Sequence, residues 1–165
     1  YDMCTDATPD EMKKFLIGDT KYTFAKFGTV NLKIDGIRAD ITTLRLETGY
    51  ADFRHPNKVV FTRNLEEDYR RRDFTINALY MDKNYNIIDF VDGQKDLKDK
   101  IIRFIGDPEL RIKEDPLRII RAQRFESKLG FKYEKNTEEA LHKLSYLVDE
   151  LNPEKVKAEL AKLNK

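Results

Sequence analysis

The sequence has little cysteine and little histidine: its 165 residues include one cysteine, Cys4, and two histidines. A single cysteine excludes an internal disulfide and a cysteine zinc cluster, and two histidines are too few for a histidine-rich metal site. No hydrophobic run approaches the length of a membrane span, and no charged and then apolar leader opens the sequence. We therefore expect a protein of a reducing compartment, cytoplasmic by default, with no membrane partner.

An excess of charge of one sign is also lacking. The 31 lysines and arginines nearly cancel the 30 aspartates and glutamates, which leaves a net charge of +1 and no basic tail. Any contact with nucleic acid must therefore come from local clusters of charge. A chain of this length, with 40% hydrophobic and 37% charged residues, is expected to bury one moderate core. It shows no internal repeat and no low-complexity tract.

The first part of the chain alternates in the manner of strands. Thr8-Pro9 begins a short helix that is expected to run to about Ile17. Alternating apolar residues then flank Asp35-Gly36 and predict a β-hairpin with a tight turn. They are Val30, Leu32 and Ile34 before the turn and Ile37, Ala39 and Ile41 after it. Residues 47–58 show no clear period and are expected to form a loop.

Helical patterns dominate the second part of the chain, from about residue 65 onward. Pro116 and Pro153 stand at expected helix starts, and Gly130 stands at an expected helix end. The fold class predicted from these patterns is α+β, with a mixed-sheet head over residues 1–105 followed by an all-helical portion over residues 106–165.

Two aspartates stand where strands are expected. Alternation places Asp40 on the face opposite to Ala39 and Ile41, and Asp2 lies beside the apolar Met3. Two carboxylates that a sheet brings together repel each other unless a divalent cation lies between them, which is the arrangement of two-metal phosphoryl transfer. The alternative, more common on spacing alone, is a solvated aspartate on an exposed strand face.

Three consecutive arginines, Arg70, Arg71 and Arg72, lead into an expected apolar helix with Asp73 at its capping position. A phosphate or sugar docked at that helix start would meet guanidiniums and free backbone amides together. Arg72 and Asp73 could then hold a triphosphate oxygen and a ribose hydroxyl. A solvated basic turn with an ordinary aspartate N-cap explains the pattern equally well.

Residues 114–125 place a carboxylate before three arginines at three-residue steps: Asp115, Arg118, Arg121 and Arg124. Because a carboxylate only accepts and a guanidinium only donates, Asp115 and Arg118 match a base edge with an amine beside an unprotonated ring nitrogen. Cytosine and adenine have that edge, whereas uracil and guanine present a carbonyl and a ring N–H. Arg121 and Arg124 would remain for phosphates or for holding the pair. The alternative is an ordinary helix ion pair worth roughly 0.2–0.5 kcal/mol.

Several of these stretches, in this order, resemble the class II tRNA nucleotidyltransferases, the bacterial CCA-adding enzymes and their poly(A) polymerase relatives. The resemblance runs over nearly the whole chain. It is carried by Asp2 with residues 5–9 and by residues 40–45 (metal motif), 49–56 (flexible loop), 71–78 (ribose-binding motif), 88–103 (head-to-neck motif) and 114–124 (nucleotide-selecting motif).

The resemblance implies an enzyme that adds CTP and ATP to the tRNA 3′ end without a template. It implies a nucleotidyltransferase head over residues 1–105 and a nucleotide-selecting neck over residues 106–165. The implied roles are Mg²⁺ binding and catalysis by Asp2 and Asp40, ribose and phosphate binding by Arg72, Asp73 and Asn77, base reading by Asp115 and Arg118, and support of the nucleotide by Arg121 and Arg124.

The family pattern also includes elements that this sequence does not contain. The first aspartate of the metal motif and a glycine-rich phosphate-binding stretch should precede Tyr1, and a helical body and tail should follow Lys165. We therefore expect a head-and-neck fragment with an incomplete two-metal site, inactive without the missing N- and C-terminal parts of the same enzyme. A poly(A) polymerase of this family, or a nucleotide- or RNA-binding module without catalysis, are the alternatives.

Overall fold

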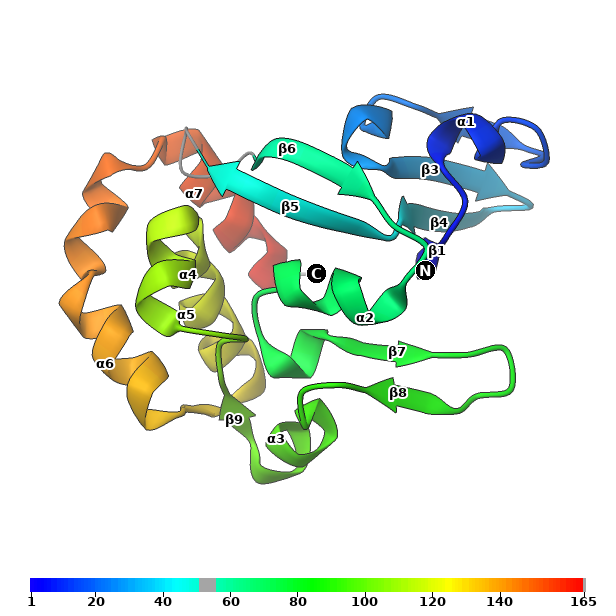
Figure 1. The fold of residues 1–165 in the computed structure, drawn as a ribbon. Helices are drawn as coiled ribbons and strands as arrows, with labels where there is room; N and C mark the ends of the chain where they lie inside the picture. The colour runs from blue at the N-terminus through cyan, green and yellow to red at the C-terminus, as the bar shows by residue number, and fades with distance from the viewer. Residues whose placement is uncertain (51–55, 165) are drawn as a thin grey trace. The chain divides into compact units, whose positions relative to one another are not determined.

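The computed structural model describes residues 1–50 and 56–164, which divide into two compact units. Residues 1–48 and 57–71 make up the first unit, and residues 49–56 and 72–165 make up the second. The α+β fold class is confirmed, since the structure contains several strands and several helices (Figure 1). Among the described residues, no helix is both long and apolar enough to cross a membrane.

The first unit is built on a four-stranded mixed sheet (Figure 1). Its strands are β1 (Asp2–Thr5), β2 (Asp19–Lys21), β3 (Thr29–Ile34) and β4 (Ile37–Thr43), in the order β1-β4-β3-β2. β1 runs parallel to β4, whereas β3 is antiparallel to both of its neighbours, β4 and β2. The predicted hairpin is confirmed: Asp35 and Gly36 join β3 to β4 with φ values of 48° and 80°, as a type I′ turn requires.

One face of this sheet is buried in a small core of Met12, Val30, Ala39 and Ile41. Met12 comes from α1 (Pro9–Met12), whose start is fixed by reciprocal hydrogen bonds between Thr8 and Glu11. The helix ends at Met12 instead of continuing to residue 17 as expected. Ile37 was predicted to face the core but is half exposed, because it pairs with Ile34 beside the turn and both lie outside the buried cluster.

A second, two-stranded sheet and a helical segment follow the first sheet along the chain. β5 (Arg45–Tyr50) pairs with β6 (Pro56–Phe61), and α2 (Leu65–Asp68) is followed by a single 3₁₀ turn at Tyr69–Arg71. A loop was expected over residues 47–58, but strands occupy both ends of this range. Residues 51–55, part of the flexible-loop stretch 49–56, lie outside the described residues. The buried Asp68 links the start of β5 to the 3₁₀ turn, since it accepts hydrogen bonds from the Arg45 N–H at 3.0 Å and from Arg71 Nε at 2.8 Å.

The second unit combines short strands with the main helices. Its elements are a 3₁₀ turn (Thr75–Asn77), β7 (Leu79–Met81), β8 (Ile87–Asp89), α3 (Gly93–Asp99), β9 (Ile101–Ile102), α4 (Pro108–Glu114), α5 (Leu117–Leu129), β10 (Lys132–Tyr133), α6 (Lys135–Lys143), a 3₁₀ segment (Ser145–Glu150), α7 (Pro153–Leu160) and a last 3₁₀ turn (Ala161–Asn164). α5 packs on α7 and α4 packs on α6 (Figure 1).

The core of the second unit crosses the boundary that we expected at residue 105. Phe74, Ile102 and Phe104 share one buried cluster with Ile112 and Ile119 of the helices. The long segment of the second unit therefore begins at Arg72, because residues 72–105 bury apolar side chains against the helices. The division into a head over residues 1–105 and a neck over 106–165 stays a prediction about domains.

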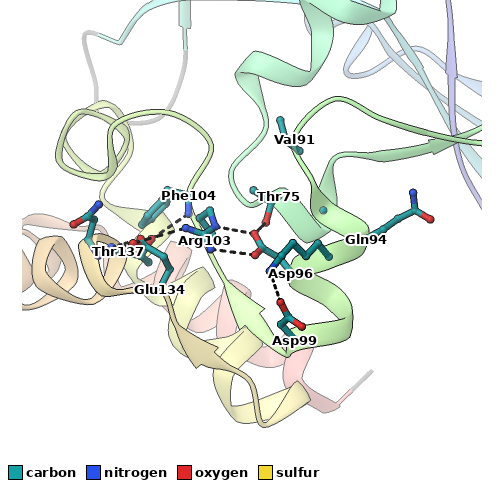
Figure 2. A network of polar contacts seen from close by, with 12 residues as sticks. Thr75, Val91, Gln94, Asp96, Asp99, Arg103, Phe104, Glu134 and Thr137 are labelled. Atoms are coloured by element: carbon teal, nitrogen blue, oxygen red, sulfur yellow. Dashed lines mark hydrogen bonds and ion pairs between the residues drawn. The ribbon is translucent and has the colours of Figure 1, made fainter.

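A polar network within the second unit ties its strands to its helices (Figure 2). Asp96 of α3 is 3% exposed and accepts hydrogen bonds from Thr75 Oγ1 at 2.7 Å and from Arg103 Nε at 2.9 Å. Arg103 also lies 3.8 Å from Glu134, the N-cap residue of α6. These contacts fix the short segment after β9 against both α3 and α6.

Candidate metal- and nucleotide-binding residues

The sheet of the first unit brings the two predicted metal-binding aspartates side by side. Asp2 of β1 and Asp40 of β4 are Cα partners in the parallel pairing, and both are exposed. Neighbouring strands lie about 4.8 Å apart and paired residues share a face, so oxygens of both carboxylates can reach one cation. Within residues 1–50 and 56–164, no group of three or more histidine, cysteine or acidic side chains could hold a metal. The described residues thus offer a pair of carboxylates there, and the metal site stays a prediction.

Asn31 of β3 is a neighbour of Asp40 that the sequence reasoning missed. Its side-chain amide donates to Asp40 Oδ1 at 2.7 Å, and the two residues are cross-strand partners. Counting outward from the Asp35-Gly36 turn gives this pairing, so the hairpin prediction already contained the signal. The hydrogen bond fixes the orientation of the Asp40 carboxylate.

Asp73 does not cap an apolar helix, and this part of our expectation is wrong. A single 3₁₀ turn follows it, with Phe74 at the N-cap position and no side-chain cap. Such a turn is too short to offer the row of free amides that would hold a phosphate. Asp73 is instead 7% exposed, and its Oδ1 accepts from the Phe74 N–H at 2.7 Å and from Asn77 Nδ2 at 3.2 Å.

Arg121 of α5 completes the surroundings of Asp73. Its Nε donates to Asp73 Oδ2 at 2.7 Å. Burial alone would raise the pKa of Asp73, but Arg121, the Phe74 N–H and the Asn77 amide together lower that pKa below its ordinary value. The structure thus joins Asp73, Asn77 and Arg121, which are three of the predicted nucleotide-binding residues.

Arg72 lies in the same part of the second unit. Its guanidinium stacks 4.7 Å from the centre of the Tyr80 ring, and its Nε donates to the Tyr80 hydroxyl at 2.9 Å. Arg72 Nη1 also donates to the Asn77 carbonyl at 3.4 Å. Tyr80 was not singled out from the sequence, which indicates a helical stretch there, whereas the structure places Tyr80 in β7.

Residues 114–125, which carry Asp115 and the three arginines at three-residue steps, do not form one continuous helix. α4 ends at Glu114, Asp115 is extended with φ −148° and ψ 93°, and α5 begins at Leu117. Pro116 is the reason, because a proline disfavours the helical conformation of the residue before it. Asp115 Oδ1 accepts from the Leu117 N–H at 3.1 Å, so this carboxylate is positioned by the turn between the two helices.

Arg118 is held by the protein at one end of its guanidinium. Its Nη1 donates to the Arg111 carbonyl at 2.7 Å and to Glu114 Oε2 at 2.9 Å, and the residue is 5% exposed. Glu114, which the sequence reasoning did not select, therefore forms a helix ion pair with Arg118. The alternative interpretation of the sequence had expected Asp115 in that pair.

Arg124, predicted to contact phosphates or to hold the base-reading pair in position, is bound to an acidic side chain of α7. It is 8% exposed, its Nε donates to Glu159 Oε1 of α7 at 2.9 Å, and Lys162 binds the other oxygen of Glu159 at 2.6 Å. Burial raises the pKa of Glu159, but Lys162 and the two arginines Arg121 and Arg124 lower this pKa by more than burial raises it. The pKa of Glu159 therefore lies below its ordinary value. No sequence pattern connects Arg124 with a residue 35 positions later.

We expect replacement of Asp73 by asparagine to destabilise the second unit. The amide cannot pair with the charge of Arg121, so the free energy of unfolding should fall by about 2 kcal/mol at neutral pH. Because the folded-state pKa of Asp73 is lowered, its contribution is complete above about pH 4 and is lost as the pH falls further. Urea unfolding at pH 7 and at pH 3 measures both effects.

Asp99→Asn is the matched control, since Asp99 forms an exposed ion pair with Lys95 in the same unit. It should leave the urea midpoint unchanged. Equal midpoints for the Asp73 and Asp99 variants at pH 7 would contradict the role given to the buried pair.

Comparison with known proteins gives a consistent family. Residues 1–103 match the model of the poly(A) polymerase head domain. The chain is 44% identical over 162 residues to the CCA-adding enzyme of Lactobacillus helveticus, and 47% identical over 162 residues to that of Ligilactobacillus salivarius. Each alignment covers 98% of this chain and 40% of the relative, so the chain spans about two fifths of their length.

Solved structures agree with these matches. The Bacillus stearothermophilus CCA-adding enzyme in complex with CTP is 36% identical, with a TM-score of 0.86 over 97% of this chain and 38% of that one. A tRNA nucleotidyltransferase complexed with a primer tRNA and an incoming ATP analog is 32% identical, with a TM-score of 0.78 over 97% of this chain and 46% of that one.

Proposed function

This chain belongs to the poly(A) polymerase head-domain family of nucleotidyltransferases, and we propose that it is the head-and-neck part of an enzyme that adds CTP and ATP to the tRNA 3′ end. The observation that carries the proposal is the pairing of Asp2 with Asp40 in a chain whose relatives over 98% of its length are CCA-adding enzymes. The partners are then CTP, ATP, the tRNA 3′ end and the remaining parts of the same enzyme. Residence in the cytoplasm belongs to the same proposal.

Mg²⁺ is the proposed cofactor, with Asp2 and Asp40 as its ligands. Both side chains are exposed carboxylates on one sheet face, and hard oxygen ligands of this kind suit Mg²⁺. When bound, the metal would neutralise triphosphate charge and activate the primer hydroxyl. Asn31 holds one oxygen of Asp40 and so presets the carboxylate for its ligand role.

The nucleotide is proposed to be chosen by Asp115 and Arg118. Asp115 would accept from the exocyclic amine, and Arg118 would donate to the ring nitrogen of cytosine or adenine. Arg118 Nη1 donates to Glu114 and to the Arg111 carbonyl, and these two hydrogen bonds orient the guanidinium for contact with a base. A side chain that the protein already holds loses less conformational entropy when it binds a base.

The ribose and phosphates are proposed to meet Arg72, Asp73 and Asn77. These side chains lie together, and Arg121 supports them through its ion pair with Asp73. Arg124 contributes indirectly, since its bond to Glu159 anchors α5 on α7.

The match of residues 1–103 to the poly(A) polymerase head domain favours a second candidate, a poly(A) polymerase. Such an enzyme would extend RNA with ATP alone. The sequence motifs do not distinguish the two activities, because both enzymes must read adenine.

We expect the complete enzyme to add two cytidines and one adenosine to a tRNA that lacks its terminal CCA. Transfer from radiolabelled CTP or ATP, resolved by gel electrophoresis, measures this directly. The 165-residue chain alone should give no product, because its described residues offer only a pair of carboxylates for the metal.

Incorporation of ATP alone, in long tracts and on any RNA, would favour the poly(A) polymerase. Nucleotide binding without any transfer by the complete enzyme would show a module that lacks catalysis and would overturn the proposal.

A further inference from the structure

An open pocket of about 380 Å³ lies on the exposed face of the first unit's sheet. Its polar lining consists of Asp19, Lys21, Asn31, Lys33, Arg38 and Asp40. The volume lies in the range of small-ligand sites, and three cationic side chains outnumber two carboxylates.

The strand register explains why the side chains gather there. Lys33 of β3 is the cross-strand partner of Arg38 on β4, and the next pair on the same face is Asn31 with Asp40. Two residues along a strand correspond to about 7 Å. The cationic pair therefore lies within one side-chain length of the candidate metal ligand Asp40.

The pairing of Lys33 with Arg38 is unfavourable for the sheet taken alone. Like charges directly opposite each other on antiparallel strands repel and destabilise the pairing. Within the part of the chain that the structure describes, no ion pair is found for Lys21, Lys33 or Arg38, although Asp19 is the partner of Lys33 on β2. An anion above the strands would remove this repulsion.

Asp40 does not supply that anion among the described residues, since its carboxylate accepts from the Asn31 amide at 2.7 Å and forms no ion pair with Lys33 or Arg38. The geometry points to a phosphate-binding site formed by Lys21, Lys33 and Arg38 beside Asp40. Its ligand is the phosphate of a nucleoside triphosphate or of an RNA strand. This inference rests on the proposed function only for the source of the phosphate.

Phosphate binding is tested with the 165-residue chain in EDTA, so that no divalent cation at Asp2 and Asp40 contributes. The probes are a fluorescein-labelled single-stranded oligouridylate, followed by anisotropy, and inorganic tripolyphosphate, followed by calorimetry. With RNA as the source, Lys33→Gln and Arg38→Gln should each weaken oligouridylate binding about fivefold at roughly 0.1 M salt and lower the salt slope by about 0.7. With a triphosphate as the source, they should weaken tripolyphosphate binding instead.

Two further variants make the test specific. Lys14→Gln removes an exposed lysine of the same unit that lies outside the pocket, and it should leave both affinities unchanged. Asp19→Asn removes a negative charge from the pocket and should strengthen binding. The Lys33 and Arg38 variants should melt no lower than the original chain, since each removes the repulsion between paired cations.

Affinities of the Lys33 and Arg38 variants equal to that of Lys14→Gln, for both probes, would overturn the phosphate site. That result leaves CCA addition by the complete enzyme untouched, because the transfer assay does not depend on these variants. Conversely, failure of CCA addition with a response in either binding assay would remove the proposed function and keep the site.

Discussion

Replacing Asp40 by asparagine is expected to reduce Mg²⁺-dependent nucleotide transfer by the complete enzyme roughly 10³-fold, since charge stabilisation of about 4 kcal/mol is lost. The neutral amide is a poor ligand for a hard cation and cannot balance its charge. The variant should still fold, because asparagine Oδ1 can accept the hydrogen bond that Asn31 donates to Asp40. Single-turnover transfer of CTP to tRNA measures the rate.

Asp35→Asn is the matched control for this prediction. Asp35 is an exposed aspartate of the same hairpin with φ 48°, a conformation that asparagine tolerates well. It should transfer at the original rate. Calorimetric titration with Mn²⁺ gives a second readout, in which Asp40→Asn weakens binding and Asp35→Asn does not. Unchanged transfer and Mn²⁺ binding in Asp40→Asn would exclude Asp40 as a metal ligand.

The neighbourhood of Asp40 was predictable from the sequence because strand geometry is regular. Alternation placed Asp40 opposite to Ala39 and Ile41, and the Asp35-Gly36 turn fixed the register of the hairpin. Pairing of Asp2 with Asp40 needed one further fact, the parallel addition of β1 to β4. That fact depends on long-range topology, which local patterns do not encode.

The environment of the arginines was less predictable, because it depends on side chains from distant elements. Arg121 binds Asp73, which is 48 positions earlier, and Arg124 binds Glu159, which is 35 positions later. Three-residue spacing indicated a shared helix face, but it did not indicate which acids would meet that face. Burial then decides the outcome, since the buried Asp73 and the buried Arg124 each require a partner of opposite charge.

The turn at Asp115 shows how Pro116 changes the backbone of the residue before it and so interrupts the predicted helix face. The three-residue spacing predicts that Asp115 and the three arginines share one helix face, whereas the residue before a proline favours an extended conformation. Asp115 is therefore positioned by the junction of α4 and α5, and Glu114 replaces it as the helix partner of Arg118. The hydrogen-bond argument for base selection survives, because it depends on donors and acceptors and not on a continuous helix.

That argument makes a second prediction of large effect, a loss of base selection on replacing Asp115 by asparagine. Asparagine Oδ1 can keep the hydrogen bond from the Leu117 N–H, which leaves the amide nitrogen to donate where the carboxylate accepted. The exocyclic amine of cytosine or adenine then faces a donor, whereas the carbonyl of uracil or guanine gains one. We expect discrimination to fall by roughly 2 kcal/mol, or about 30-fold. The ratios of kcat/KM for CTP over UTP and for ATP over GTP measure it.

Asp149→Asn is the control, because Asp149 is an exposed aspartate of the same unit outside the nucleotide-selecting stretch. It should leave both ratios unchanged. A fall in kcat/KM that is equal for all four nucleotides in Asp115→Asn would point to lost positioning of α5, since a distorted turn weakens every substrate alike. Only a change in the ratios assigns Asp115 to the base edge, and a change confined to ATP over GTP would mean that cytosine is selected by other residues.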